Sequence, residues 1–408
     1  MTAHAAVVEP GVRGDDGGFT LLAPEGTSYR VDIASEVLAP DNPLLAEYCE
    51  GRKVVAFLGP TVDRLHGERL RRYLTARLAP GSWDMVVIGG GEEHKTMESV
   101  EEICARAKAA GLDRRGVMLA VGGGVTCDLV GFAAAIYCRG VRYIKVNTTL
   151  VGQVDVGVGV KTGVNALGTK NMLGSYHPAH ASINDPSFLR TLPERQIRCG
   201  LGEIAKMAVI KDARLFGALE ECPDVFRRPC PDPSWLPTAE HGGRGLEDYV
   251  LRTSMELMME ELCPNLREHD LARLVDFGHT FGPVIETASD YRIAHGESVA
   301  IDMAISTQLA RVLGLIGAED CERVVRLITA LGLPVHDATT CTPELMLQAL
   351  RAAWERRGRR LHLVVPDGIG SAVFVDDLED IPAGALAEAL GALAARSGGL
   401  PGPLAVAH

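Results

Sequence analysis

The first half of the chain alternates short apolar runs with longer amphipathic stretches. The apolar runs lie at residues 53–58, 85–88, 117–121 and 141–146, and glycine-rich turns follow several of them. Runs of this length between turn residues predict strands, and the amphipathic stretches predict helices. Strands that alternate with helices are typical of a parallel sheet with right-handed crossovers. We therefore expect residues 1–192 to form an α/β domain.

The pattern changes near residue 193, where apolar positions begin to recur at helical spacing. Residues 193–408 therefore predict a second, mostly α-helical domain. The tails 1–18 and 397–408 are expected to be loose, and the Pro-, Gly- and Arg-rich stretch 222–245 is expected to be an exposed insertion. The predicted helices are Glu194–Lys211, Ala213–Glu221, Leu246–Leu262, Leu271–Ala288, Val299–Leu313, Asp320–Ala330 and Pro343–Arg356, and strand-like runs remain at 361–365 and 372–375.

A glycine turn separates the strand at 117–121 from a helix-like run at 128–137. Gly122, Gly123 and Gly124 form this turn. Backbone N–H groups at the start of a helix, together with the helix dipole, favour an anion. The spacing differs from the G-x-G-x-x-G pattern of a dinucleotide-binding turn. On the pattern alone, a pyrophosphate site and a simple tight turn both stay open.

Polar side chains crowd the apolar, Gly-rich segment behind this turn. Asp155, Lys161, Asn165, Lys170 and Asn171 all lie within it. A cation in apolar surroundings needs a partner, which can be a ligand phosphate or a protein carboxylate. The segment therefore suggests a second, charged small ligand beside the glycine turn, with ordinary ion pairing as the alternative.

Other cations leave the same two interpretations open. Arg139 and Lys206 also lie in apolar or Gly-rich surroundings. The run WERRGRRL at 354–361 places four arginines around one glycine. Such a run is either a solvated face or a loop that reaches a substrate phosphate.

Two imidazoles and one carboxylate in the helical half suggest a metal site. Glu203, His279 and His295 together make a donor set that is typical of catalytic zinc, with positions left for substrate oxygens. The three residues are far apart in the sequence. Spacing alone therefore leaves each histidine open as a core or capping residue.

Charge and composition exclude several classes of protein. The formal net charge of -12 argues against a nucleic-acid surface. The ten cysteines are scattered and form no C-x-x-C pair, which predicts reduced, mostly buried thiols. No apolar run approaches about 18 residues, and the N-terminus lacks a signal-peptide core, so we expect a cytoplasmic protein with no membrane partner.

Eight ordered segments resemble a known family. The span from Lys53 to Asp376 is similar to the sugar phosphate cyclases, whose best-known member is dehydroquinate synthase. This resemblance implies a Rossmann-like NAD-binding domain followed by a helical metal-binding domain, a homodimer, and Zn2+ or Co2+ as the metal. The segments are GEEHK (91–95), GGGVTCDLVGFAAAIYCRG (122–140), NTTLVGQVD (147–155), KTGVN (161–165), KNMLG (170–174), GLGEIAKMAVIKD (200–212), DFGHTFGP (276–283) and HGESVAIDMA (295–304).

The resemblance also implies a role for individual residues. Glu203, His279 and His295 become the metal ligands. The implied NAD-binding residues are Thr61, Glu92, Lys95, Gly123, Gly124, Val125, Asp128, Thr148, Thr149, Asp155 and Lys170. The substrate phosphate would meet Arg139, Lys161, Asn171, Arg356 and Arg357. The implied catalytic residues are Lys206, Lys170, Lys161, Asp155, Asn171 and Asp276.

Several positions separate this chain from the dehydroquinate synthases. Pro283 replaces their histidine, Asp276 their asparagine and Met258 their lysine. The block 258–271 instead resembles the subgroup that acts on sedoheptulose 7-phosphate, and Asp276 favours its valiolone-forming members. The resemblance thus implies that a phosphorylated C7 ketose becomes 2-epi-5-epi-valiolone with loss of phosphate, through transient NAD oxidation, β-elimination, re-reduction and an aldol step. A 2-epi-valiolone synthase, a dehydroquinate synthase and a metal-dependent NAD alcohol dehydrogenase stay open. Gly59 stands where the family has an Asp that faces the NAD ribose.

Overall fold

The chain forms two compact units, and each is described by itself. The first unit reaches to Ile197 and takes in Met255–Glu268. The second comprises Arg198–Ser254 and the chain from His269 onward. The boundary expected between residues 192 and 193 stays a prediction.

The structure is a computed structural model that describes residues 9–228, 230 and 245–397. Residues 1–8 and 398–408 of the tails, and 229 and 231–244 of the predicted insertion, therefore lie outside the described residues. In the described half of the N-terminal tail, Gly11–Asp15 forms a strand, so the expectation of a loose tail is wrong there.

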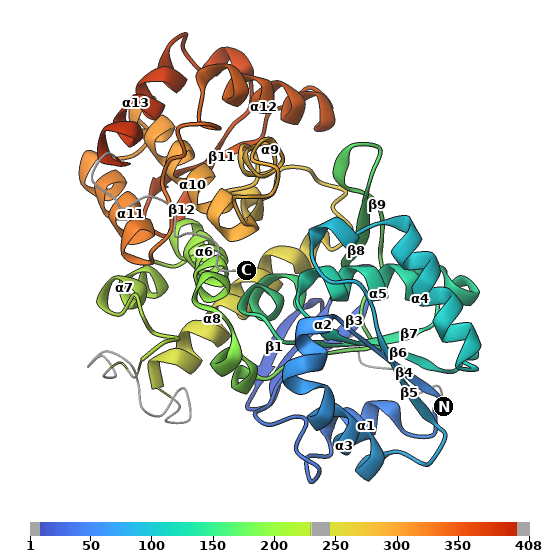
Figure 1. Ribbon diagram of the computed structural model, residues 1–408. Coiled ribbons are helices and arrows are strands. Elements are labelled where there is room, and N and C mark those ends of the chain that lie inside the picture. Colours follow the sequence, from blue (N-terminus) through green and yellow to red (C-terminus); the bar gives the residue numbers. More distant parts are fainter. Residues whose placement is uncertain (1–8, 229, 231–244, 398–408) are drawn as a thin grey trace, which may run out of the picture. The chain divides into compact units, whose positions relative to one another are not determined.

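An eight-stranded sheet is the framework of the first unit (Figure 1). Six strands run parallel in the order β3-β10-β7-β6-β4-β5, and β2 and β1 extend the sheet in antiparallel fashion beyond β3. The four runs predicted as strands form the adjacent strands β4 to β7. The bounds are β1 (Gly11–Asp15), β2 (Gly18–Leu22), β3 (Ser28–Ile33), β4 (Val54–Leu58), β5 (Trp83–Val87), β6 (Val117–Gly122), β7 (Arg142–Asn147) and β10 (Ala181–Asn184).

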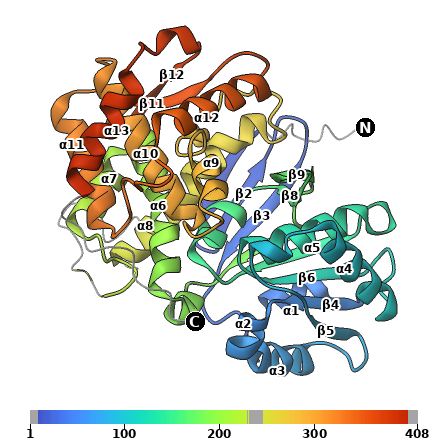
Figure 2. The same ribbon diagram turned by 45° about the horizontal axis from the view of Figure 1, so that its top comes forward.

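Helices cover both faces of this sheet (Figure 2). Val55 and Phe57 of β4 pack with α4 and α5, whereas Val54 and Ala56 pack with α1 and α3 on the opposite face. A parallel strand buried on both faces needs a continuous apolar run, which is what the sequence shows at 53–58. The helices are α1 (Leu44–Cys49), α2 (Pro60–Val62), α3 (Glu68–Arg77), α4 (Met97–Ala109) and α5 (Gly124–Ile136), and a π-helical turn, Asp63–Gly67, joins α2 to α3.

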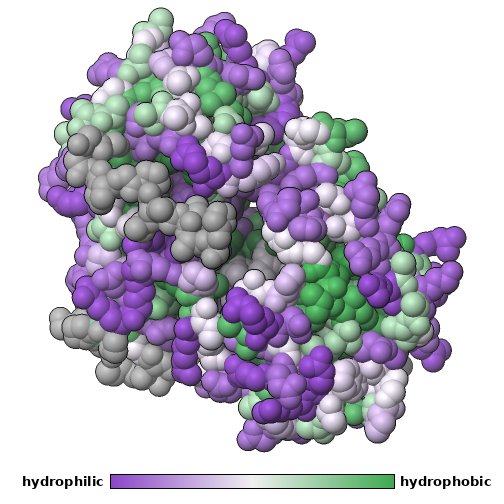
Figure 3. Space-filling view, in the orientation of Figure 1, coloured by the Kyte–Doolittle hydropathy of each residue, from purple (hydrophilic) through white to green (hydrophobic). Residues whose placement is uncertain are grey.

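A separate two-stranded hairpin follows β7 in the chain. It consists of β8 (Lys161–Ala166) and β9 (Thr169–Tyr176), and a π-helical turn at Gly152–Val156 precedes it. The tip of the hairpin is apolar yet exposed, with Leu167 at 84%. Figure 3 shows the resulting hydrophobic patch at the upper right. Sequence analysis identified this segment by its polar residues but did not predict its strands.

The second unit is mostly helical, as predicted. Its central helix, α10, is buried from Gly296 to Ala310 except at Glu297 and packs against α9, α11, α13 and β11. No described helix is long and apolar enough to cross a membrane. The elements are α6 (Glu194–Lys211), α7 (Ala213–Glu221), α8 (Gly245–Leu262), α9 (Gly282–Ala288), α10 (His295–Val312), α11 (Ala318–Ala330), α12 (Pro343–Arg356), β11 (Leu363–Gly368), β12 (Ser371–Val375) and α13 (Ala385–Ser397); the first residues of α6 and the last of α8 belong to the first unit.

One predicted helix, Leu271–Ala288, is wrong. This stretch instead holds a 3-10 turn at Leu274–Asp276, a loop, and the short helix α9. Gly278 lies in the loop with a φ of 80°, a left-handed backbone conformation that interrupts a right-handed helix. The other predicted helices of this unit are confirmed, with starts that move by up to four residues.

The expectation of reduced thiols is wrong for one pair of cysteines. Cys222 and Cys230 form a disulfide, and their Cα atoms lie 6.4 Å apart, within the range that a disulfide can span. Six of the other eight cysteines are buried. These six cysteines pack as small apolar residues inside the fold.

Candidate active site

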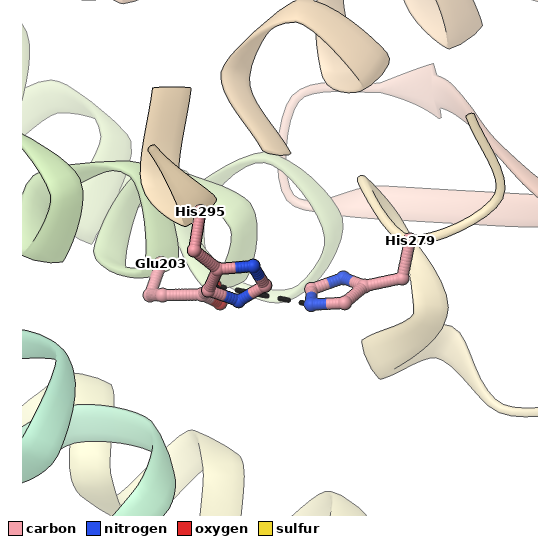
Figure 4. A group of neighbouring side chains, drawn as sticks. All are labelled: Glu203, His279 and His295. Atoms are coloured by element: carbon pink, nitrogen blue, oxygen red, sulfur yellow. Dashed lines mark ion pairs between the residues drawn. The ribbon is translucent and has the colours of Figure 1, made fainter. Parts of the chain in front are cut away.

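Glu203, His279 and His295 lie together in the second unit (Figure 4). Glu203 belongs to α6, His279 to the loop before α9, and His295 is the first residue of α10. The Nε2 atom of His295 lies 3.2 Å from Oε1 of Glu203, and Nε2 of His279 lies 3.9 Å from the same oxygen. One ligand atom from each residue falls within 4.8 Å of the others. Residues far apart in the sequence thus form one donor cluster.

Two glycines allow the helices that carry this cluster to approach closely. A Cβ atom on Gly202 would lie 2.9 Å from the carbonyl oxygen of Gly296, and one on Gly296 would lie 2.3 Å from the Cα of Cys199. Any side chain at either position would push α6 and α10 apart. Because Gly202 precedes Glu203 and Gly296 follows His295, this backbone contact sets the two donors side by side.

Both imidazoles turn Nε2 toward Glu203 and are held through Nδ1. The Nδ1 atom of His279 lies 3.0 Å from the carbonyl oxygen of Phe277, and Nδ1 of His295 lies 3.3 Å from Oε2 of Glu286. Carbonyl and carboxylate oxygens accept, so Nδ1 carries the proton and Nε2 keeps its lone pair. Metal-binding histidines are commonly oriented in this way. Two such imidazoles with one carboxylate fit a zinc ion.

Lys206 adds a buried positive charge next to the cluster. Its Nζ atom lies 2.7 Å from Oε2 of Glu203, one helical turn away on α6. Burial raises the pKa of Glu203, but Lys206 and the two imidazoles outweigh it, so the pKa of this carboxyl lies well below its usual value. Burial, and then Lys206, lower the pKa of His279 to about 4. An ionised carboxylate beside a neutral imidazole is the protonation state that a metal requires.

Asp276 is held between two arginines. Its Oδ2 atom accepts a hydrogen bond of 3.0 Å from Nη2 of Arg357, and its Oδ1 atom accepts one from Arg273. Arg357 also donates to the carbonyl oxygen of Leu361 at 2.7 Å. Two residues predicted to meet the substrate separately therefore bind each other, whereas Arg356 is exposed at the end of α12.

The predicted NAD-binding residues of the first unit follow the carboxyl ends of adjacent strands. Thr61 comes after β4, Glu92 after β5, Gly123 after β6, and Thr148 after β7. Since these four strands are parallel and hydrogen-bonded in the order β7-β6-β4-β5, the four residues belong to one edge of the sheet. Open α/β sheets bind their ligands outside this edge. Gly123, Gly124 and Val125 begin α5, which presents its N-terminus there.

Lys95 connects the start of α5 to the hairpin. Its Nζ atom is buried and lies 2.6 Å from Oδ2 of Asp128 and 2.6 Å from Oδ1 of Asn171. Asn171 has a left-handed backbone, with φ at 54°, and its N–H donates to Oδ1 of Asn165 at 2.9 Å. The structure therefore joins a predicted NAD-binding group to a predicted substrate-binding group through one lysine.

Glu92 completes the same polar network. Its Oε1 atom accepts a hydrogen bond of 2.9 Å from Nδ2 of Asn165 and lies 4.0 Å from Nζ of Lys170. Asn165 was noted in the sequence only as part of a polar cluster. The structure shows that it links the hairpin to the segment after β5, since its backbone N–H also donates to the carbonyl oxygen of Lys95 at 2.8 Å.

Arg139 and Lys161 lie apart from this network. Arg139 is exposed beyond the C-terminal end of α5, the opposite end from Gly123. Lys161 stands opposite Tyr176, the last residue of β9, and its Nζ atom lies 2.8 Å from Oε1 of Glu268. Within the first unit, the predicted phosphate-binding residues are thus not gathered at one place.

Sequence analysis missed Lys145, a buried amine on β7. Its Nζ atom donates to the carbonyl oxygens of Val156 and Gly159, each at 2.8 Å. Burial lowers the pKa of Lys145 to about 8. The two carbonyls lie in the turn between Asp155 and Lys161, which Lys145 therefore fixes. The sequence did offer a signal for this residue, because Lys145 lies inside an apolar run that predicts a buried strand.

Two domain families match the chain in succession. The 3-dehydroquinate synthase N-terminal domain matches residues 85–199, and the 3-dehydroquinate synthase C-terminal domain matches residues 200–353. The chain belongs to the 3-dehydroquinate synthase family. The family resemblance inferred from the ordered motifs is thereby confirmed.

Members of the 3-dehydroquinate synthase family resemble this chain along most of its length. A 2-epi-5-epi-valiolone synthase from Streptomyces glaucescens is 67% identical over 394 residues, which is 97% of this chain and 98% of that protein. A 3-dehydroquinate synthase from Synechococcus sp. (strain CC9605) is 38% identical over 366 residues, 88% of this chain and 93% of that protein. The solved structure of ValA, the 2-epi-5-epi-valiolone synthase of Streptomyces hygroscopicus subsp. jinggangensis 5008 with NAD+ and Zn2+ bound, aligns with a TM-score of 0.82 at 40% identity and covers 91% of this chain and 98% of that one.

Proposed function

We propose that the protein is a 2-epi-5-epi-valiolone synthase. In this proposal it is a carbon–oxygen lyase that converts sedoheptulose 7-phosphate into a C7 cyclitol and phosphate, with NAD and zinc as cofactors. The observation that carries the proposal is the 67% identity to the S. glaucescens enzyme over nearly the full length of both chains. The cluster of Glu203, His279 and His295 agrees with it, because it fits a catalytic zinc ion.

In the proposed reaction, these three residues hold zinc, for which cobalt is the alternative. When bound, the metal supplies Lewis-acid chemistry, and NAD supplies reversible hydride transfer. Lys206 donates from Nζ to a substrate hydroxyl beside Glu203 and so orients it. Asp276 accepts a hydrogen bond from a hydroxyl at the end of the substrate chain. Each carboxylate oxygen of Asp276 already accepts from an arginine, so the hydroxyl would have to share an oxygen with Arg273 or Arg357 or displace it.

The N-terminus of α5 is our proposed site for the NAD pyrophosphate. Gly123, Gly124 and Val125 contribute backbone N–H groups, and the helix dipole favours the negative charge. Asp128 and Lys95 hold this turn against the hairpin. The other proposed contacts to NAD come from Thr61, Glu92, Thr148, Thr149, Asp155 and Lys170.

Loss of phosphate requires cations or amides that stabilise the departing anion. We propose Lys161, Asn171 and Arg356 for this role and leave out Arg139, which lies at the opposite end of α5 from the glycine turn. Arg357 would join them only by exchanging its bond to Asp276 for one to phosphate. Asp155 and Lys170 would hold substrate hydroxyls.

We further propose that the enzyme is a cytoplasmic homodimer. Sedimentation equilibrium of the purified protein would test the dimer.

The decisive experiment is incubation of the purified protein with sedoheptulose 7-phosphate, NAD and Zn2+. We expect release of about one phosphate per substrate with no net NADH, and a cyclitol whose NMR spectrum is that of 2-epi-5-epi-valiolone. The His279→Ala variant, prepared in the same way, controls for contaminating activity. Turnover of 3-deoxy-arabino-heptulosonate 7-phosphate in place of sedoheptulose 7-phosphate would refute the proposal, and so would net NADH formation, which marks an alcohol dehydrogenase.

A further inference from the structure

Asp302 is a buried carboxylate that touches none of the three clustered donors. It lies on α10, two helical turns after His295, and has no exposed surface. Its Oδ2 atom accepts three backbone hydrogen bonds, from the N–H groups of Thr280 at 2.8 Å, Phe281 at 2.6 Å and Gly282 at 2.8 Å. These are the three residues that follow His279 in the chain.

The other oxygen of Asp302 is also occupied. Its Oδ1 atom accepts a hydrogen bond of 3.0 Å from the hydroxyl of Ser306, one turn further along α10. Both oxygens are therefore fixed, one by its own helix and one by the loop. A carboxylate held in this way on a rigid helix is a fixed anchor for the loop rather than a mobile side chain.

The loop has little freedom to find another arrangement. Gly278, just before His279, has a φ of 80°, and a Cβ atom there would lie 2.7 Å from Cγ1 of Val299 and 3.2 Å from Cγ of Met303. The loop thus lies directly on α10. Without Asp302, three N–H groups of buried residues would lose their acceptor, and an unsatisfied buried donor destabilises the fold.

This arrangement couples the two histidines of the cluster. His295 begins α10, and Asp302 on the same helix holds the chain immediately after His279. The separation of the imidazoles, whose ring centroids are 5.5 Å apart, is therefore set through Asp302. A small shift of the loop would move Nε2 of His279 relative to Glu203 and His295.

We propose that Asp302 is a positioning residue of the metal centre: it fixes the loop of His279 on α10 and thereby sets the geometry in which His279 and His295 bind the metal. This inference rests on the proposed zinc site. Asp302 neither binds the metal nor meets the substrate. Its effect is on how tightly and in which geometry the metal is held.

The test compares three variants of the full-length protein. Asp302→Ala removes the acceptor, Asp302→Asn keeps one carbonyl oxygen that can accept from the loop, and Ser306→Ala removes only the bond to Oδ1. Zinc affinity is measured by competition with a chromophoric chelator, and the absorption spectrum of the Co2+-loaded protein reports the ligand geometry. Circular dichroism monitors the fold.

We expect Asp302→Ala to lower zinc affinity about 10- to 100-fold, the usual effect of removing a group that orients a metal ligand. Asp302→Asn should lose less zinc affinity than Asp302→Ala, and Ser306→Ala should lose the least. The change in the Co2+ spectrum should likewise be largest for Asp302→Ala, smaller for Asp302→Asn and smallest for Ser306→Ala. If Asp302→Ala does not fold, Asp302→Asn decides, with an expected loss of several-fold and an altered Co2+ spectrum.

Two negative results have different meanings. If wild-type protein binds zinc and His279→Ala does not, while the Asp302 variants match wild type in affinity and in Co2+ spectrum, the positioning role is refuted and the zinc site stands. If wild-type protein and His279→Ala bind zinc equally, the proposed metal site itself fails, and the role of Asp302 fails with it.

Discussion

The Nη2 atom of Arg357 lies 3.0 Å from the Oδ2 atom of Asp276, so an ion pair joins two residues for which the sequence predicts separate contacts with the substrate. Both side chains are largely buried, at 13% and 12% exposed. Arg273 binds the other oxygen of Asp276. Because two guanidiniums share this carboxylate, a substitution at Asp276 or Arg357 also alters the contacts of the other residue.

We therefore predict that Asp276 and Arg357 act as one unit in catalysis. Asp276→Asn, Arg357→Met and the double variant should lower kcat/KM by similar factors. The coupling free energy from this double-mutant cycle should be about 1–3 kcal/mol. Steady-state phosphate release measures it, with Arg351→Met as the matched control because Arg351 is exposed on α12, the helix that ends just before Arg357. Additive effects of Asp276 and Arg357 would mean that each meets the substrate independently.

Lys206 and Glu203 should separate metal binding from turnover. Glu203→Gln removes a charged donor, so we expect bound zinc, measured by atomic absorption after dialysis, to fall to near zero. Lys206→Met leaves the three donors in place, so zinc should be retained while kcat falls about 10²-fold or more, as expected for loss of a positioned charged group. Retention of full kcat by Lys206→Met would show that Lys206 has no role in the reaction.

The buried amine of Lys145 should make stability depend on pH. Its folded-state pKa of about 8 lies below the reference value of 10.5. Between these values the folded state releases the proton while the unfolded state keeps it, so stability rises with pH in this window. Relative to Lys145→Met, the wild-type protein should gain about 2 kcal/mol in free energy of unfolding from pH 7 to pH 9.5. Urea unfolding of both proteins checks this, and a constant difference would show that folding does not lower the pKa of this amine.

Gly59 leaves space at the carboxyl end of β4. A Cβ atom there would lie 3.8 Å from Cα of Gly90 and 3.9 Å from Oγ1 of Thr126, which is ordinary contact, and its backbone is extended. A carboxylate at such a position can bind a ribose hydroxyl. Gly59→Asp should therefore lower the Kd for NAD several-fold, as measured by calorimetry. Gly59→Asn is the uncharged control, and an increase in Kd for Gly59→Asp would contradict the position of the ribose that the family resemblance implies.

Sequence periodicity was sufficient for most of the architecture. The continuous apolar runs of β4 to β7 report strands buried on both faces, and α6 and α7 have the bounds that were predicted from helical spacing. Periodicity failed at Leu271–Ala288, where the apolar spacing suits a helix. There the backbone of Gly278 and the acceptor provided by Asp302 decide the local structure. Both are tertiary effects that no local pattern contains.

The candidate site was predictable only in part. The ordered motifs pointed to Glu203, His279 and His295, and the structure brings these residues together. Their supporting residues could not be found in this way. Glu286 and Asp302 act through contacts between different elements, with His295 and with the loop after His279, and helical spacing alone does not reveal these contacts.

The path of α8 has a consequence for how the protein is made. This helix begins in the second unit and ends in the first, and Met255–Glu268 then supplies Cys263, whose thiol contacts the carbonyl oxygen of Leu22, and Glu268, the partner of Lys161. During synthesis, the first unit can therefore be completed only after this segment has been made, about sixty residues beyond its last strand and turn. A nascent chain stopped at Ile197 would expose the surface that this segment covers.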